Sequence, residues 1–353
     1  MTNKRFTKSL LFLLVGTGLV LCLNFWPVGK SAYAQHKFKS RVIVVRNSKI
    51  RNKDKTLNSL QIKRTLNAAL RALTLKDSGR EALKQLIGPQ DIVGLQVNTF
   101  QGKLTNATRP ELAAALGDFI KQTGVPENNI IIWDRAQDEL ESVGYQINRS
   151  KQGMRCLASL TARPGKRNSS VLMGYADQEI NLWANCTTRI SSIIARHCSI
   201  NINMPVLRTH KFKEDTGINN AVMNMYHAIE LTNTNKKPLC GNQCDPGAAE
   251  IYALPALKNK TKLIVCDAFS PLYQGGPFDD PRYHWNYNGL IVGFDPVAVD
   301  IVGLKILQKY RTQKGNSKWL PLEPGYLLTC AQPKYKLGNA DFAYIDLTEM
   351  TLD

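Results

Sequence analysis

A basic segment that follows an apolar run carries the first candidate chemistry. In "ININMPVLRTHKFKEDTG", residues 200–217, His210 lies between Arg208 and Lys211. The intrinsic pKa of an imidazole is near neutral, so His210 can serve as an acid, a base or a metal ligand. The guanidinium and ammonium groups beside it suit a carboxylate or phosphate on a ligand. The alternative is an exposed basic loop that happens to contain a histidine.

Other predicted strands also end in polar residues. Asn98 follows "DIVGLQV", Asp134 and Arg135 follow "NIIIW", Asp267 follows "KLIVC", and Asp295 follows "GLIVGF". In open α/β sheets, ligands bind in the crevice outside the carboxyl ends of the strands. We therefore expect these residues to line one cleft together with His210. The competing explanation is that Asp and Asn simply favour the turns that follow strands.

We assign roles to these residues by their chemistry. His210 is the candidate acid, base or ligand, and Asp267 and Asp134 would orient or assist it. Arg135 and Arg208 would hold the anion of a substrate, with Asn98 beside them. A metal would need partners such as His197 or His227, but no spacing enforces this, so the metal content stays unknown. No G-x-S-x-G, P-loop or G-x-G-x-x-G motif follows a predicted strand.

Two further carboxylates accompany the last long predicted helix. Asp295 directly precedes Pro296, which is the pattern of an Asp N-cap with Pro at the first helical position. Asp300 lies five residues further on, inside the helix. It is expected to reach the same edge as the other polar residues or to pair with a base such as Arg135. Both acids are candidate substrate-binding residues.

Apolar runs and helical periodicity alternate along the chain, which predicts an α/β fold with a mostly parallel sheet and helices on both faces. Residues 35–353 are expected to form one domain, with a candidate lobe boundary near 146–168 that would divide it into two lobes. Strands are predicted at 41–45, 91–97, 129–133, 199–207, 262–266 and 289–294, and helices at 60–73, 110–124, 218–230, 248–257 and 296–310. Pro205 predicts an edge or a bulge near the end of its strand.

The first 34 residues have the charged, apolar, A-x-A order of a secretory signal. We expect cleavage after Ala34 and an exported, periplasmic or extracellular protein without a later membrane span; an uncleaved anchor is the alternative. The leader carries four basic residues and no acids, so cleavage lowers the net charge from +18 to +14. This charge suits a small anionic ligand. The basic residues are scattered and no nucleic-acid motif accompanies them, so no nucleic-acid partner is expected.

The cysteines suit an oxidising compartment. "CGNQC" favours a local disulfide between Cys240 and Cys244, or two free thiols, over a metal site, because one C-x3-C pair supplies only two of four ligands. The iron–sulfur spacing C-x2-C-x2-C-x3-C is absent. Seven cysteines remain after cleavage, so at least one thiol stays free unless chains pair.

Several segments together resemble a known family. "GLQVNTFQGKLTNATRPELAAAL", "INMPVLRTH", "GINNAVMNMYHAI", "CDPGAAEIYALPALKNKTKLIVCDAFSPLYQGGP" and "GLIVGFDPVAVD" are similar, in order, to the domain-of-unknown-function family 362. The family has no settled activity, and its members are often exported. Its His, Gly and Lys pattern distantly resembles nickel-pincer lactate racemases. Where members read Leu-Lys-Asn, this chain has Val222, Met223 and Asn224. Asn224 is therefore a candidate binding residue, and the loss of the lysine weakens the racemase analogy.

Two hypotheses follow. The first is an exported enzyme that acts on a small anionic or hydroxylated substrate in the cleft at the carboxyl ends of the strands. The second is a non-catalytic binding or assembly protein that uses the same cleft or its basic surface. The missing lysine favours the second, whereas the convergence of polar strand ends favours the first.

Overall fold

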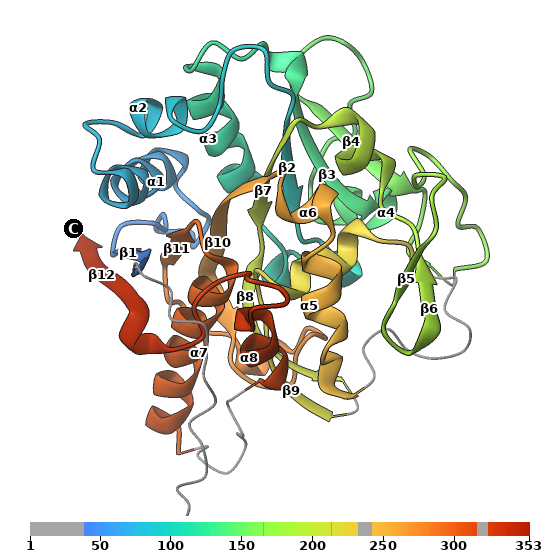
Figure 1. Ribbon diagram of the computed structural model, residues 1–353. Helices are drawn as coiled ribbons and strands as arrows, with labels where there is room; N and C mark the ends of the chain where they lie inside the picture. Colours follow the sequence, from blue (N-terminus) through green and yellow to red (C-terminus); the bar gives the residue numbers. More distant parts are fainter. Residues whose placement is uncertain (1–38, 165, 213, 232–241, 316–323) are drawn as a thin grey trace, which may run out of the picture. The chain divides into compact units, whose positions relative to one another are not determined.

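The computed structural model of the protein describes residues 39–164, 166–212, 214–231, 242–315 and 324–353. Its main feature is a ten-stranded sheet in the order β12-β1-β11-β10-β7-β2-β3-β4, with β8 and β9 attached through β10 (Figure 1). The strands are β1 (Ser40–Asn47), β2 (Val93–Val97), β3 (Ile130–Ala136), β4 (Arg155–Leu160), β7 (Ile200–Met204), β8 (Val206–Phe212), β9 (Glu214–Asn219), β10 (Thr261–Leu272), β11 (Gly289–Gly293) and β12 (Ile345–Leu352). A separate hairpin pairs β5 (Ile180–Leu182) with β6 (Cys186–Thr188).

Most neighbouring strands in this sheet are parallel. Only β11, which pairs antiparallel with β1 and β10, and β9, which pairs antiparallel with β8, run against the others among the described strands. The strand–helix alternation in the sequence thus produces the parallel sheet that it predicts. The predicted α/β class with a mostly parallel sheet is confirmed.

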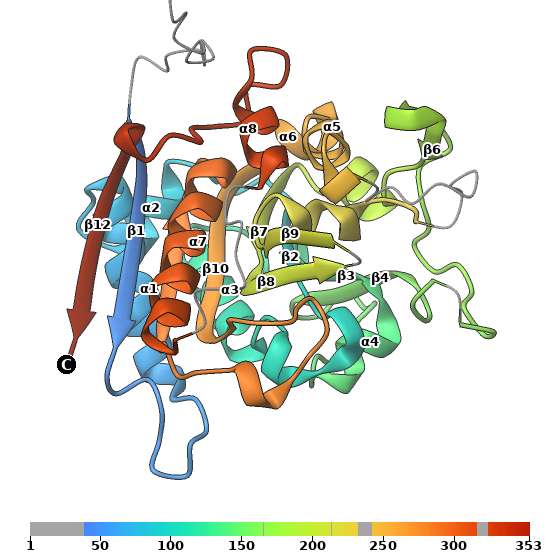
Figure 2. The same cartoon turned by 90° about the horizontal axis from the view of Figure 1, so that it is seen from below.

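Helices cover both faces of the sheet, each over its own apolar core (Figure 2). In β1, Val42 and Val44 point into the core under α7, whereas Ile43 and Val45 point into the core under α1, as the two-residue period of a strand requires. The helices are α1 (Ser59–Thr74), α2 (Gly79–Lys84) and α3 (Pro110–Lys121) on one face, and α5 (Gly247–Tyr252), α6 (Pro255–Lys258), α7 (Pro296–Gln313) and α8 (Gly325–Ala331) on the other, with α4 (Gln137–Ser142) following β3.

The predicted helix over 218–230 is wrong. This stretch forms the end of β9 and a 3-10 helix, η6 (Met223–Ala228). Its backbone groups are satisfied by distant side chains: Asp300 accepts from the N–H groups of Ala221 and Val222, and Asn203 donates to the carbonyl of Ala221. Because these side chains replace the usual i to i−4 partners, the segment need not be an α-helix.

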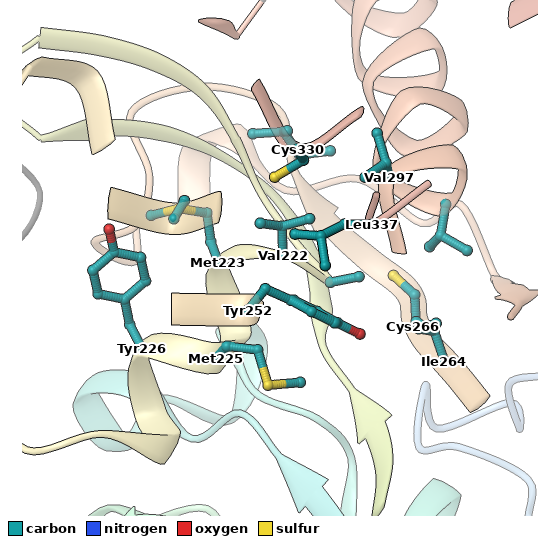
Figure 3. Close-up of a cluster of buried hydrophobic side chains, with 14 of the residues drawn as sticks. Val222, Met223, Met225, Tyr226, Tyr252, Ile264, Cys266, Val297, Cys330 and Leu337 are labelled. Carbon is teal, nitrogen blue, oxygen red and sulfur yellow. The ribbon is translucent and has the colours of Figure 1, made fainter. Parts of the chain in front are cut away.

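The apolar side of η6 fills the core between α5, α7 and β10. Figure 3 shows Met223, Met225 and Tyr226 beside Tyr252 of α5, with Cys266 of β10 in the same cluster. Met223 is 4% exposed. The position where the resemblance leads us to expect a lysine is therefore an apolar core position in this chain.

Pro205 separates β7 from β8 without ending the extended chain. A proline has no N–H to donate to a ladder, so regular pairing stops there. Its carbonyl accepts from the N–H of Asp267, and β10 then changes its partner from β7 to β8. Pro205 itself belongs to no strand, and β7, which ends directly before it, is a central strand rather than an edge.

Three sequence expectations concern parts of the chain outside the sheet's centre. Residues 146–168, the candidate lobe boundary, supply β4 to the same sheet. The predicted signal, residues 1–34, lies outside the described residues. Within the described part of the chain, no helix has the length and apolar character needed to cross a membrane.

The cysteines divide into two kinds. Cys244 is disulfide-bonded, and Cys240, its predicted partner, lies outside the described residues. Cys156, Cys198, Cys266 and Cys330 are buried free thiols. Burial raises the pKa of Cys156 and of Cys198 to about 12, so both remain protonated at neutral pH.

Candidate functional site

A buried histidine–carboxylate pair lies at the carboxyl end of β3. Asp134 is fully buried, and its Oδ1 lies 2.7 Å from Nδ1 of His227 in η6. The other oxygen accepts from the N–H and the hydroxyl of Thr99. Burial alone would raise the pKa of the Asp134 carboxyl, but the charges and hydrogen bonds of His227, Arg135 and Thr99 outweigh it and hold this pKa below its usual value. The carboxylate is thus stable in its ionised form.

Two guanidinium groups lie near this pair, and only one of them has a carboxylate partner. Arg135 forms a two-oxygen ion pair with Glu139 of α4, and both side chains are buried. Arg208 of β8 is completely buried, yet no carboxylate of the described residues lies within ion-pair distance of it. It donates to the carbonyl of Asn106 and to Oδ1 of Asn98 and Asn219, while its Nε has no hydrogen-bond partner in the described structure.

The ring of Phe100 lies against both guanidinium groups. Its centroid is 5.1 Å from the Arg135 carbon Cζ and 5.5 Å from that of Arg208. The His227 ring lies 6.2 Å away and the Phe278 ring 5.8 Å away, both tilted against it. Phe100 is only half-buried and Phe278 is 45% exposed, so this is the side on which the site approaches solvent.

A row of buried amides positions the candidate binding residues. Asn98, directly after β2, donates to Oδ1 of Asn224, and Asn224 in turn donates to Oδ1 of Asn203 in β7. Gln96 of β2 donates to the carbonyl of Asn224. Since each amide both donates and accepts, the row fixes η6 against the sheet and holds Asn98 where it accepts from Arg208.

His210 has a different environment from the one the sequence predicts. It lies inside β8 rather than after a strand, and it is 6% exposed. Burial and the nearby charge of Arg208 lower the pKa of its imidazole to about 4. His210 is therefore neutral at pH 7, and it is buried in a β-strand, not exposed in a basic loop.

The long loop after β10 lies directly on β8. Lys211 donates its backbone N–H to the carbonyl of Gly276, and a Cβ at residue 276 would lie 2.0 Å from the carbonyl oxygen of Thr209. Only glycine fits such an approach. The loop also contacts the segment after β2, because Asn106 donates to the carbonyl of Pro277 and Asp279 accepts from Thr105.

Asp267 lies in the middle of β10, not at its end. Its side chain accepts from the backbone N–H groups of Arg109 and Phe269. Burial raises the pKa of this carboxyl, against the lowering effect of Arg109. Asp267 thus binds the turn that precedes α3 and reaches the Asn98 region only through that turn, where Asn98 and Thr108 exchange hydrogen bonds.

The prediction that Asp295 shares this edge is wrong. Because β11 is antiparallel to β10, Asp295 follows it at the opposite edge, where it lines a separate pocket of about 570 Å³. It caps α7 by accepting from the N–H of Ala298, as predicted. Asp300 does not pair with Arg135; it accepts from the backbone of Ala221 and Val222. Burial raises the pKa of Asp300 to about 8.

Several residues of the site are absent from the sequence-based candidate set, above all His227, Glu139 and Phe100. The sequence suggests His227 only as a possible metal partner, because it lies in a stretch with helical periodicity and follows no predicted strand. Glu139 lies four residues after Arg135, in α4, and reaches back to Arg135 at the end of β3. A second pair joins His284 to Asp279 in the loop after β10, with 2.7 Å between Nε2 and Oδ1.

The described residues contain no group of three or more His, Cys, Asp or Glu side chains arranged to hold a metal ion. The site instead joins Asn98, Asp134, Arg135, Arg208 and Asn224 with His227, by hydrogen bonds or through the ring of Phe100. Two pockets that the structure describes lie elsewhere, one of about 430 Å³ beside α7 and β12 and the one lined by Asp295.

These features define an α/β protein with a buried, charged site at the carboxyl edge of a mostly parallel sheet. The chain belongs to the family of the domain of unknown function DUF362, whose family model matches residues 93–305. That stretch runs from β2 into α7 and contains every residue of the site.

Other comparisons are more distant. Comparison with curated protein sequences gives no match. The crystal structure of a protein from Thermotoga maritima is similar to this chain with a TM-score of 0.37 and 9% sequence identity. The similarity covers 73% of this chain, which spans 59% of that protein's length. No comparison supports the weaker resemblance to nickel-pincer lactate racemases.

Proposed function

We propose that this protein is an enzyme that binds a small compound bearing a carboxylate or phosphate against Arg208 and moves a proton with His227. The observation that carries the proposal is the complete burial of Arg208 without a carboxylate partner among the described residues. A buried cation without a partner costs several kcal/mol unless an anion compensates it. A ligand anion would supply this compensation.

The desolvation of Arg208 supports an anionic ligand. Burial and the neighbouring charge of Arg135 lower the pKa of the Arg208 guanidinium to about 9, against the raising effect of the more distant carboxylates of Asp134, Glu139 and Asp279. Arg135 is already neutralised by Glu139. The Nε of Arg208, which has no partner in the described structure, is a donor available for the anion.

Phe100 would control access to this cation. Its ring lies against both guanidinium groups on the solvent side of the site. An anion can replace the ring at Arg208 if Phe100 turns outward, and the exposed Phe278 beside it would have to turn with it. The cation–π contact that is lost contributes about 0.5–2 kcal/mol, less than a charge-assisted contact with an anion provides.

His227 is better placed than His210 for proton transfer. With Asp134 accepting at Nδ1, the imidazole of His227, when it is neutral, carries its proton there and keeps a lone pair on Nε2. No described residue bonds to that Nε2. His210, with a pKa of about 4, is a weak base that suits contact with a ligand rather than proton transfer.

Binding is tested by calorimetric titration of the protein with oxalate and with inorganic phosphate. We expect Arg208→Met to weaken binding by about 10-fold to 100-fold, since a hydrogen bond to a charged group contributes about 1.5–3 kcal/mol. Arg282→Met is the matched control, because Arg282 is an exposed arginine that pairs with Asp280 in the loop after β10. Equal affinity of the Arg208→Met variant and the wild type would show that Arg208 does not bind the anion.

Proton transfer is tested by incubating 2-oxo and 2-hydroxy acids with the protein in D2O and following loss of their C–H signals by NMR. We expect exchange with the wild type and a decrease of about 10²-fold to 10⁴-fold for His227→Gln. His210→Gln is the control and should retain most of the exchange. Retention of the full rate by His227→Gln would contradict the assignment.

A non-catalytic binding protein is the second candidate, and Met223 favours it. Where the family has a lysine, this chain has a buried side chain in the apolar core, which cannot donate a proton or hold a phosphate. Oxalate or phosphate binding that depends on Arg208, together with no exchange in any acid tested, would support this candidate over the enzyme.

We also propose export through the leader of residues 1–34, which rests on its charged, apolar, A-x-A order. The intact mass of the protein isolated from its own cells tests this. We expect a mass that corresponds to a chain beginning at Gln35. A chain that retains the leader would support the uncleaved anchor.

A further inference from the structure

A second pocket, separate from the Arg208 site, lies between α7, β12 and the loop after β10. Its volume is about 430 Å³, within the range of small-ligand sites. Neither Asp134 nor Arg208 lines it. Its main lining residues are Arg46, Trp285, Tyr287, Lys309, Tyr310 and Glu349.

Aromatic rings form one wall of this pocket. Trp285 stacks on Tyr310, with centroids 4.2 Å apart and an angle of 9° between the rings. Tyr287 lies edge-on to Trp285, and Tyr273 supports Tyr310 from the buried side at 5.0 Å. These contacts hold the rings rigidly while Trp285, Tyr287 and Tyr310 stay half-buried. A fixed, partly exposed aromatic wall provides a flat apolar surface next to polar groups.

The polar lining has hydrogen-bonding capacity that the described protein does not use. The side chains of Lys309, Gln313, Asn286 and Glu349 form no hydrogen bond or ion pair with other described residues, and the indole N–H of Trp285 has none either. Together they offer donors and acceptors around the rim of the aromatic wall. Arg46, by contrast, already donates to the carbonyl of Tyr287 and lies over its ring.

The charge of the lining distinguishes between ligand classes. Glu349 faces the same pocket as Arg46 and Lys309, and this carboxylate also contributes to raising the pKa of Tyr287 to about 12, after burial as the larger cause. A carboxylate in the lining disfavours polyanions such as nucleic acids. Sugar hydroxyls can donate to the carboxylate and accept from the ammonium and amide groups, while the C–H face of a pyranose ring can lie on the aromatic wall.

We propose that this pocket binds a neutral oligosaccharide, with one sugar ring against Trp285 and its hydroxyls bonded to Lys309, Gln313 and Glu349. The proposal does not depend on the function of the Arg208 site, because no residue is shared between the two. It would give the protein a carbohydrate-binding surface at the side of the sheet formed by β1 and β12.

The test is a titration of the full chain with cellohexaose, chitohexaose and maltohexaose, followed by NMR and calorimetry. We expect at least one of them to bind, Trp285→Ala to lower its affinity by at least about 10-fold, and Gln313→Ala to lower it by about 3-fold to 10-fold. Gln313 is exposed at the end of α7, so this variant tests the pocket without disturbing the aromatic stack.

Phe342→Ala is the matched control, because Phe342 is an exposed aromatic ring on which Lys305 of α7 lies, outside the pocket. The Phe342→Ala variant should bind the oligosaccharide with the same affinity as the wild type. The proposal is overturned if none of the three oligosaccharides binds, if Trp285→Ala and Gln313→Ala bind as the wild type does, or if hexagalacturonate binds more tightly than all three neutral sugars.

Discussion

Asp134 and Asp300 are both fully buried carboxyl groups that accept backbone N–H hydrogen bonds, yet their pKa values move in opposite directions. Asp134 has His227, Arg135 and a threonine hydroxyl as neighbours, and its pKa is lowered. Asp300 has only two backbone N–H groups against the cost of burial, and its pKa is raised to about 8. Burial therefore does not decide the charge of an acid; the charged neighbours do.

The opposite pKa shifts indicate different roles for Asp134 and Asp300. The ionised Asp134 can stabilise a positive imidazole, so it suits a site in which His227 gains and loses a proton. Asp300 fixes the backbone before η6 and so keeps His227 and Asn224 in place from the opposite side. One acid is placed to take part in chemistry, whereas the other holds the segment that supplies its partner.

The largest expected effect is the pH dependence that Asp300 confers. Its folded-state pKa of about 8 exceeds the ordinary value of 3.8, so the folded protein binds one more proton than the unfolded chain between these values. The stability that this proton provides is complete below about pH 4 and is lost as the pH rises through about 8. The free energy of unfolding of the wild type, relative to Asp300→Asn, should fall by up to about 5 kcal/mol over this range.

Urea denaturation at several pH values between 4 and 8.5 measures this difference. Asp341→Asn is the control, because Asp341 is an exposed residue that caps a 3-10 helix. A constant difference between the wild type and Asp300→Asn would mean that Asp300 is ionised throughout and that the contrast with Asp134 does not exist.

The next largest effect is the loss of Asp134 itself. Asp134→Ala leaves His227 and the donors of Thr99 buried without their acceptor, which should cost about 3–5 kcal/mol in the free energy of unfolding. Asp134→Asn keeps the shape and should cost less. Urea denaturation at pH 7 checks both, and an alanine variant as stable as the wild type would contradict the proposed charge network.

A smaller loss in the free energy of unfolding is expected for Asn203→Ala. It leaves the buried carbonyl of Ala221 without its donor and Asn224 with only its longer bond to the Gln96 carbonyl, at a cost of about 1–3 kcal/mol in the free energy of unfolding. The backbone amide shifts of η6 should change as well, which NMR would detect. Asn259→Ala, at an exposed helix end, is the comparison. If the η6 shifts stay unchanged, the amide row does not position this segment.

The smallest effect is that of Thr99→Val, which removes only the hydroxyl donor to Asp134 and keeps the backbone N–H bond. We expect a loss of about 1 kcal/mol in the free energy of unfolding, measured by urea denaturation. Thr74→Val, in which the hydroxyl that bonds to a helix carbonyl is lost, is the control for stability alone.

The sequence predicts most of the sheet, because strands with continuous apolar runs such as "NIIIW" and "KLIVC" are recognisable without partners. It does not predict β12, whose exposed edge has a mixed composition. The sequence also does not predict that β11 is antiparallel to its neighbours, because an apolar run has the same pattern in either direction. That single reversal removes Asp295 from the predicted cleft.

The site is predictable only in part. Asn98, Asp134, Arg135 and Arg208 follow from the position of polar residues at strand ends, which is a local signal. His227 does not, because its role depends on a 3-10 segment whose backbone bonds come from Asp300 and Asn203, residues distant in sequence. Long-range bonds of this kind leave no periodic pattern, and so the helical spacing over 218–230 is misleading.

The break at Pro205 has a consequence for motion. β7 is held on both sides by β10 and β2, whereas β8 beyond the proline pairs with β10 and with the edge strand β9, with a register shift against each of them. A strand with fewer central partners opens at a lower free-energy cost. The amide hydrogens of β8 should therefore exchange with solvent sooner than those of β7. Arg208 lies on this strand, so its separate opening would provide a path by which the proposed ligand reaches a fully buried cation.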